Sequence, residues 1–236
     1  MAIKSLSFKV AAALGTFIVI LTVGTVFFGS GGRSNPSSPA HNQLKSHVAF
    51  AKAAKIHLSS TENHVAHKYK LSKLETRTAR KLPVTAIGDS VMLDVKPNIK
   101  QVFPHSAVSG SVGRQFYSLP KIVRQLKASG HLSNYIVINL GTNGPPTQAD
   151  INSVLKTVGN RHIFWINTRV PRSWQGTTNR LITKAAKQHK NVHVVNWYKA
   201  SKGHSGWFAS DRVHVDLTGA VYYTHTLAKE VSRVLN

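Results

Sequence analysis

The chain has 236 residues, 42% of them hydrophobic, which allows one sizeable folded domain plus a smaller segment and excludes wholesale disorder. Its 31 Lys and Arg against 8 Asp and Glu give a formal net charge of +23, which favours anionic partners such as nucleic acid, anionic lipid or phosphate-rich wall polymers. It has no cysteine, which excludes disulfides, thiolate metal sites and a cysteine nucleophile.

The N-terminal part predicts a membrane anchor. Residues 10–28 form an uncharged run rich in Val, Ile, Leu, Phe and Ala, which follows Lys4 and Lys9. At about 1.5 Å per residue, a helix of this length matches the hydrocarbon thickness of a bilayer. We therefore predict a cytoplasmic N-terminus at 1–9, an uncleaved transmembrane signal anchor at 10–28, and an extracellular remainder. The alternative is secretion after cleavage, although no Ala-x-Ala site follows the run.

Residues 29–82 predict a basic, flexible linker. Gly, Ser, Pro and Asn dominate 29–40, a composition typical of flexible segments. Residues 41–82 are basic, rich in histidine and poor in large apolar side chains, so we expect a tether that is partly helical at best. Its five histidines lack close carboxylates and regular ligand spacing, so no metal site is predicted there.

From residue 83 onward, short apolar runs alternate with longer segments of helical character. Strands are predicted at 84–87, 106–108, 135–140, 162–167 and 192–196, and helices at 115–128, 147–158, 177–189 and 217–234. Such alternation implies right-handed crossovers and a parallel sheet covered on both faces. The predicted fold is an α/β domain at 83–236, a three-layer α/β/α sandwich with a five-stranded parallel sheet in the order 2-1-3-4-5.

A serine follows the first predicted strand, in the sequence Gly88-Asp89-Ser90. At the carboxyl end of a parallel strand, Ser90 would lie beside free backbone N–H groups and can act as a nucleophile when a base reaches its hydroxyl. The alternative role for Ser90 is a helix cap. Asp89 is expected to tie the turn together.

A base and its orienting group precede the last predicted helix, in Asp211-x-x-His214. His214 has an ordinary pKa near neutrality, and Asp211 can reach the Nδ1 side of its ring. Asp216 competes for this role, but its sequence is more typical of a helix N-cap. Acyl transfer also needs donors for an oxyanion, and the Ser90 N–H, a glycine N–H and the Asn143 amide can supply them.

These motifs together resemble the SGNH (GDSL-type) hydrolase superfamily, through Gly88-Asp89-Ser90, Gly113, Gly141-x-Asn143 and Asp211-x-x-His214. The resemblance covers 83–236 and implies the flavodoxin-like fold of that superfamily. It makes Ser90 the nucleophile, His214 the base and Asp211 the third member of the triad. Gly113, or less favourably Gly110, and Asn143 would complete the oxyanion hole.

Further motifs are similar to the extracellular catalytic domain of peptidoglycan O-acetyltransferases of Gram-positive bacteria: Val112-Gly113-Arg114-Gln115, Gly141-Thr142-Asn143-Gly144 and Val170-Pro171-Arg172-x-Trp174, with Asn179. In that family a multi-helix membrane acyltransferase domain usually precedes this one and delivers acetyl groups outward. This chain departs from the pattern, since it has one candidate span. This departure leaves the acetyl donor and the net reaction open; if the chain is an acetyltransferase, a separate multi-span membrane protein would have to supply the acetyl group.

Three functions follow as hypotheses. The first is an anchored O-acetyltransferase that moves acetyl groups through Ser90 onto cell-wall sugar hydroxyls, and the second is an esterase of such O-acyl groups. The third is a non-catalytic basic module that binds teichoic acid or nucleic acid. The expected partner is a cell-wall glycan or another polyanionic wall polymer, with no nucleic acid, and no metal or organic cofactor is indicated.

Four side chains are candidates for contacts with the acceptor: Arg114, Arg172, Trp174 and Trp207. Aromatic faces can pack on sugars, and arginines can fork onto carboxylates or phosphates. Core packing for the tryptophans and solvated charge for the arginines are the alternative interpretations.

Overall fold

Five parallel strands form the central sheet in residues 56–236, the part of the chain that the computed structural model describes. They are β1 (Val84–Gly88), β2 (Ala107–Ser109), β3 (Tyr135–Asn139), β4 (His162–Ile166) and β5 (Val192–Val195). Their order is β2-β1-β3-β4-β5, and every neighbouring pair is parallel. The predicted fold class, strand count and strand order are confirmed.

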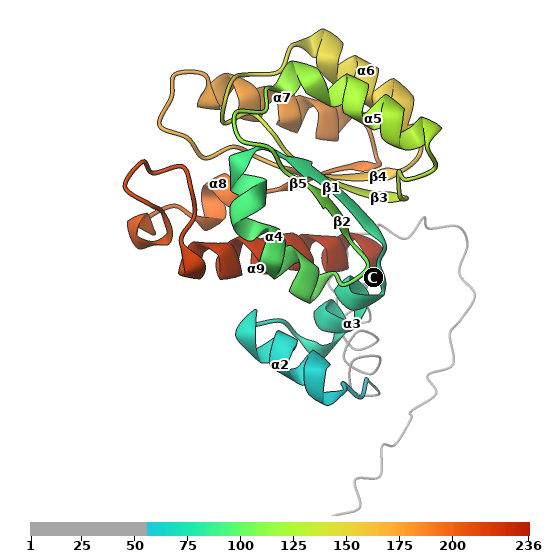
Figure 1. The fold of residues 1–236 in the computed structure, drawn as a ribbon, viewed down its shortest axis with the longest axis vertical. Coiled ribbons are helices and arrows are strands. Elements are labelled where there is room, and N and C mark those ends of the chain that lie inside the picture. Colours follow the sequence, from blue (N-terminus) through green and yellow to red (C-terminus); the bar gives the residue numbers. More distant parts are fainter. Residues whose placement is uncertain (1–55) are drawn as a thin grey trace, which may run out of the picture. The chain divides into compact units, whose positions relative to one another are not determined.

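Helices cover the sheet on both faces (Figure 1). One layer holds α5 (Leu119–Ala128), α6 (Gln148–Val158) and α7 (Gln175–Gln188), and the other holds α4 (Ser90–Val102) and α9 (Leu217–Leu235). Because successive strand residues point to opposite faces, Ile136 and Ile138 belong to one apolar core and Val137 to the other. The connections include η1 (Phe116–Ser118), α8 (Trp197–Ala200) and η2 (Ser205–Trp207).

The prediction of a flexible linker at 29–82 is wrong for residues 60–81. Two helices, α2 (Ser60–Lys68) and α3 (Lys73–Lys81), occupy that stretch, and each begins with a capping box. In each box a serine hydroxyl accepts from the backbone N–H three residues later, where a glutamate reaches back to the serine N–H. The few apolar residues there are enough to join the core, because Val65, Tyr69 and Leu71 are all buried against it.

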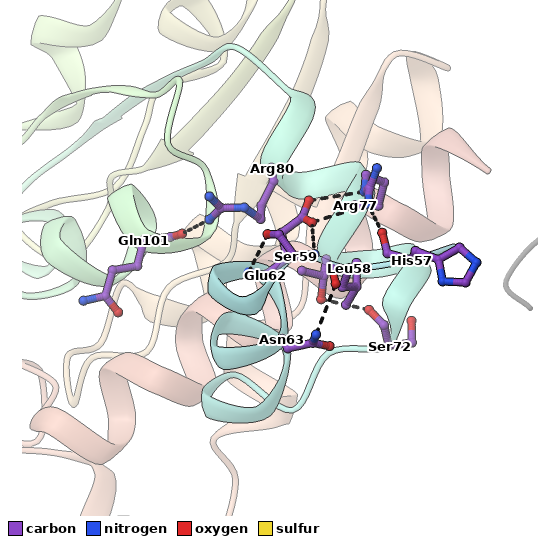
Figure 2. A network of polar contacts seen from close by, with 10 residues as sticks. His57, Leu58, Ser59, Glu62, Asn63, Ser72, Arg77, Arg80 and Gln101 are labelled. Atoms are coloured by element: carbon purple, nitrogen blue, oxygen red, sulfur yellow. Dashed lines mark hydrogen bonds and ion pairs between the residues drawn. The ribbon is translucent and has the colours of Figure 1, made fainter. Parts of the chain in front are cut away.

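Polar contacts join α2 and α3 to each other and to α4 (Figure 2). Arg77 of α3 pairs with Glu62 of α2 at 3.2 Å and also donates to the His57 carbonyl. Arg80 donates to the Gln101 carbonyl of α4 at 2.9 Å, and the Tyr69 hydroxyl donates to the Gln101 side chain at 2.7 Å. The folded domain therefore begins before residue 60, well ahead of the boundary expected at 83.

Replacing Tyr69 tests whether this N-terminal pair of helices contributes to stability. Tyr69→Ala deletes a fully buried ring and should lower the free energy of unfolding by about 3 to 5 kcal/mol. Tyr69→Phe keeps the ring but loses the hydrogen bond to Gln101, so it should cost only about 1 kcal/mol. Urea denaturation of the three proteins measures both effects, and equal stabilities would mean that α2 and α3 are a loosely attached tether after all.

The predicted signal anchor at 10–28 and the first part of the predicted linker lie outside the described residues. Among helices of residues 56–236, none has the length and apolar character needed to cross a bilayer.

Candidate active site

Ser90 lies where β1 passes into α4, at the carboxyl edge of the sheet. Asp89 caps α4: its fully buried carboxylate accepts from the Val91 N–H at 3.1 Å and from the Thr142 hydroxyl of the loop after β3. Burial raises the pKa of Asp89, while the bond from Thr142 opposes this change. As expected from the sequence, Asp89 ties the turn, and it also joins the ends of β1 and β3.

The segment before α9 brings a histidine and an aspartate to this serine. His214 Nε2 lies 2.8 Å from Ser90 Oγ, and His214 Nδ1 lies 2.5 Å from Asp211 Oδ2. The other oxygen of Asp211 accepts from the backbone N–H groups of Val213 and His214 at 2.9 and 3.0 Å, which holds the short loop in place. Asp216 instead accepts from the Gly219 N–H at 2.6 Å and caps α9, as its sequence predicts.

The charges in this arrangement favour a basic imidazole. The hydrogen bond from His214 lowers the pKa of Asp211 to about 2, so its carboxylate is ionised at neutral pH. The same bond raises the pKa of His214; burial lowers it, and the carboxylates of Asp94, Asp211 and Asp89 raise it further. A histidine between a serine hydroxyl and an ionised carboxylate can remove the serine proton and stabilise the resulting positive charge.

A cavity of about 320 Å³ opens above Ser90 and His214. Thr142 and Asn143 of the loop after β3 line it, together with Val170, Arg172 and Trp174 of the loop after β4. The cavity combines apolar walls, an amide and a guanidinium beside the serine, which suits a small acyl group attached to a polar carrier.

The loop after β4 holds two of the four predicted acceptor contacts, Arg172 and Trp174, at the cavity wall. Trp174 Nε1 donates to the Gly141 carbonyl at 3.1 Å, which fixes the ring against the loop after β3. The Asn179 side chain bonds both the N–H and the carbonyl of Thr168 at 2.7 and 2.9 Å. Asn179, part of the quoted motif, therefore supports the base of the loop.

Arg114 and Trp207, the other two predicted contacts, do not line the cavity. Arg114 donates to the carbonyls of Gly88 and Ser109, both at 2.8 Å, and so joins the ends of β1 and β2. The Trp207 ring stacks between His204 and Tyr222, with centroid separations of 3.9 and 4.2 Å. Packing within the protein accounts for both side chains.

Of the three predicted oxyanion donors, Ser90 and Asn143 line the cavity and Gly113 does not. The Asn143 amide lines the cavity and makes two long contacts of 3.4 Å, to the Arg114 carbonyl and the Thr142 hydroxyl, so it can turn toward a ligand at little cost. The Ser90 N–H lies in the first turn of α4, where helix geometry leaves N–H groups without acceptors. Gly113 is exposed and does not line the cavity; its φ of +69° serves a tight turn in which the Arg114 N–H donates to the Ser111 carbonyl.

Sequence reasoning missed Asp94, which lies one helical turn after Ser90 and accepts from the Val215 N–H at 3.3 Å. The four-residue spacing was the available signal, because it places both side chains on the same face of α4. Thr142 was part of a quoted motif, but its bond to Asp89 depends on the neighbouring positions of β1 and β3. Over residues 56–236, His, Asp and Glu form no group of three that could hold a metal ion.

Comparisons with known proteins show which proteins this chain resembles in fold and in sequence. No family model matches the chain. The C-terminal catalytic domain of peptidoglycan O-acetyltransferase A (OatA) of Streptococcus pneumoniae has the same fold, with a TM-score of 0.58 at 19% identity over 64% of this chain and 93% of that domain. A family 3 carbohydrate esterase of Clostridium thermocellum also shares the fold, with a TM-score of 0.50 at 14% identity, over 64% of this chain and 97% of the esterase.

The chain is also similar in sequence to a longer protein. The O-acetyltransferase OatA of Staphylococcus aureus (strain NCTC 8325 / PS 47) is 39% identical over 144 residues, which are 61% of this chain and 24% of that protein. The chain thus spans about a quarter of the length of the curated relatives it matches. The predicted resemblance to SGNH hydrolases, and among them to the OatA catalytic domain, is confirmed.

Proposed function

We propose that this protein is an extracytoplasmic serine O-acetyltransferase that moves an acetyl group through an acetyl-Ser90 intermediate onto a sugar hydroxyl of the cell wall. The observation that carries the proposal is the continuous hydrogen-bonded series Asp211–His214–Ser90 at the floor of a cavity. The similarity to proteins named O-acetyltransferase supports the choice of acetyl transfer among the reactions that such a series performs.

In the first half-reaction, Ser90 Oγ attacks the acetyl carbonyl carbon while His214 Nε2 accepts the serine proton. The ionised Asp211 stabilises the imidazolium, and the Ser90 N–H and Asn143 amide face the oxygen that becomes negative. The bond to the donor then breaks, and His214 returns the proton to the leaving group. In the second half-reaction a sugar hydroxyl gives its proton to His214 and attacks the acetyl carbon, and Ser90 is restored.

Hydrolysis is the second candidate, because the triad is open to solvent. The side chains of His214 and Asp211 are 40% and 47% exposed, so water can reach the base from the cavity mouth. The same residues would then act as a cell-wall esterase, with water in place of the sugar. Full-length chain, given an activated acetyl ester with and without a chitooligosaccharide or muropeptide, separates the two. Acetylated sugar by mass spectrometry supports transfer, whereas free acetate at the same rate with every acceptor supports hydrolysis.

The location is part of the same proposal. The apolar run at 10–28, preceded by Lys4 and Lys9, would anchor the chain in the cell membrane with the catalytic domain outside, in a Gram-positive bacterium. Acetyl groups would arrive from a separate multi-span membrane protein. Protease treatment of intact cells should digest the catalytic domain, and protection from protease would refute an extracellular position.

A pH dependence follows from the pKa of His214. Its pKa is raised from the ordinary value of 6.5, and only the neutral imidazole can accept the serine proton, so kcat/KM should fall below a midpoint that lies above pH 6.5. Asp211→Asn removes the largest cause of this rise, so the midpoint should move to lower pH while kcat falls by about 10⁴-fold. Initial rates of acetyl release across pH measure both, and an unchanged midpoint would exclude Asp211 as the partner of the base.

The proposed partner is an anionic wall polymer with phosphodiester groups. All eight side-chain carboxylates of the chain lie within 56–236; seven take part in a cap, a turn or an ion pair, and Asp94 accepts from the Val215 N–H. Two of them pair with arginine, as Glu62–Arg77 and Glu230–Arg233. The excess positive charge in this part of the chain is therefore left to face solvent and anions.

Helix α7 offers one binding surface, or track, along which such a polymer could lie. It begins directly after Trp174 of the cavity wall and contains no carboxylate. Arg180, Lys184 and Lys187 are exposed, lie on one helical face and line a surface hollow. Replacing all three by Gln should lower the salt slope of polymer binding by up to about three, because each of these cations would neutralise one phosphate group. The matched control replaces the exposed Lys73, Lys81 and Lys96; an equal decrease there would indicate diffuse attraction without a track.

A further inference from the structure

The backbone that carries His214 is held from one side by a short antiparallel pairing. The Ala209 N–H donates to the His214 carbonyl at 2.8 Å, and the Asp216 N–H donates to the Trp207 carbonyl at 3.0 Å, on either side of the bridge between Phe208 and Val215. In an extended strand, successive N–H groups point to opposite sides. The Val215 N–H therefore points away from this pairing, and its acceptor must come from elsewhere.

Asp94 of α4 supplies that acceptor, with its Oδ2 3.3 Å from the Val215 nitrogen. Ser90 and Asp94 are four residues apart, on one face of α4. Helix α4 therefore meets the His214 segment at two points: the Ser90 hydroxyl contacts the imidazole, and the Asp94 carboxylate contacts the next peptide. The distance between nucleophile and base thus depends on two side chains of the same rigid helix.

We propose that Asp94 is a positioning residue for His214, which holds the peptide after the histidine and places a second negative charge beside the imidazole. The proposal rests on the proposed acetyl transfer through Ser90. As Ser90 gives up its proton, the imidazole becomes positive, and the Asp94 charge stabilises that state in addition to Asp211. Asp94 does not touch the reacting atoms and acts through His214.

The charged groups around His214 come from four parts of the fold. Asp94 on α4, Asp211 on its own loop and Asp89 at the end of β1 all raise the pKa of His214, and burial opposes them. Arg172 of the loop after β4 lines the same cavity and carries the opposite charge. The Asp89 carboxylate accepts from the Thr142 hydroxyl and the Val91 N–H, so replacing it would also disturb the turn after β1. Asp94 is therefore the better residue at which to test the effect of a second carboxylate on His214.

Two substitutions separate the charge of Asp94 from its hydrogen bond. Asp94→Asn keeps an oxygen for the Val215 N–H but removes the charge, whereas Asp94→Ala removes both. A purely structural role would make Asp94→Asn resemble wild type in every respect except stability. Asp216→Asn is the matched control, because it removes a carboxylate two residues from His214 and keeps an N-cap that asparagine serves equally well.

The experiment measures kcat and KM against pH on the full-length chain with an activated acetyl ester, and the pKa of His214 by NMR in the Ser90→Ala background. Asp94→Asn should move the fall of kcat at low pH (the acid limb of the profile) and the NMR pKa of His214 to lower pH by about one unit, with KM unchanged. Asp94→Ala should add a loss in kcat of about 10²-fold, because the imidazole is no longer held over Ser90. Asp216→Asn should leave the acid limb in place.

An acid limb that stays fixed in Asp94→Asn, or that moves equally in Asp216→Asn, would overturn the proposal. If Asp94→Ala does not fold, Asp94→Asn alone decides. The NMR titration needs no activity, so it tests Asp94 independently of the reaction. Full activity in Ser90→Ala would instead refute the proposed function.

Discussion

Ser90→Ala is expected to lower kcat for acetyl release and acetyl transfer by about 10⁴- to 10⁶-fold, with the thermal midpoint of unfolding unchanged. The reason is that Ser90 Oγ lies 2.8 Å from His214 Nε2, and within residues 56–236 no other hydroxyl contacts this nitrogen. Water can replace the serine only without a covalent intermediate. Single-turnover kinetics with an activated acetyl ester, together with thermal unfolding by circular dichroism, measure both quantities.

The losses of kcat in Ser90→Ala and His214→Ala should not add up in the double variant. His214→Ala should cost about as much as Ser90→Ala, and the double variant should cost no more than either, because the two side chains act as one unit. The exposed His189 at the end of α7 provides the matched control, and His189→Ala should retain full activity. If the losses in Ser90→Ala and His214→Ala instead multiply in the double variant, the two residues do not share a step.

Gly219→Ala is expected to disturb both stability and activity. A Cβ on Gly219 of α9 would lie 2.0 Å from the Trp207 carbonyl oxygen, which is much closer than atoms can approach. That carbonyl accepts from the Asp216 N–H, so the whole segment from Trp207 to Asp216, including His214, would have to move. We expect a loss of about 1 to 3 kcal/mol in the free energy of unfolding and of about 10²-fold in kcat.

The opposite expectation comes from helix propensity alone, which favours Ala over Gly by about 1 kcal/mol. Gly176→Ala near the start of α7 isolates that preference, because its Cβ would meet only the end of the Arg180 side chain, at 3.4 Å. Gly176→Ala should therefore be neutral or slightly stabilising, and fully active. Equal behaviour of the two variants in urea denaturation and acetyl release would refute the role of the close contact between α9 and Trp207.

The fold could be predicted because its signals are local and periodic. Strands β1, β3 and β4 are short apolar runs that are almost wholly buried, and right-handed crossovers leave few topologies for alternating strands and helices. The helices α2 and α3 could not be found from the average composition of 41–82, which is that of a polar tether. Their evidence was the capping boxes Ser59–Glu62 and Ser72–Glu75, which mark helix starts even in a polar stretch.

The placement of Ser90, Asp211 and His214 followed from the rule that reactive groups gather at the carboxyl edge of a parallel sheet. Arg114 and Trp207 could not be assigned, since an arginine that joins strand ends and one that faces a ligand look alike in sequence. The Trp207 ring likewise stacks on His204 and Tyr222, which lie in different parts of the chain, so its packing role is not visible in the local sequence. Such contacts depend on tertiary packing, which periodicity does not encode.

Trapping the acetylated protein tests the central claim most directly. Full-length chain is mixed with an activated acetyl ester, quenched by acid within one turnover and digested, and the peptides are mapped by mass spectrometry before and after a chase with muropeptide. We predict one acetyl group on Ser90 that disappears during the chase and reappears on a sugar hydroxyl. Acetylation at any other residue, or equal labelling of Ser90→Ala, would contradict transfer through Ser90.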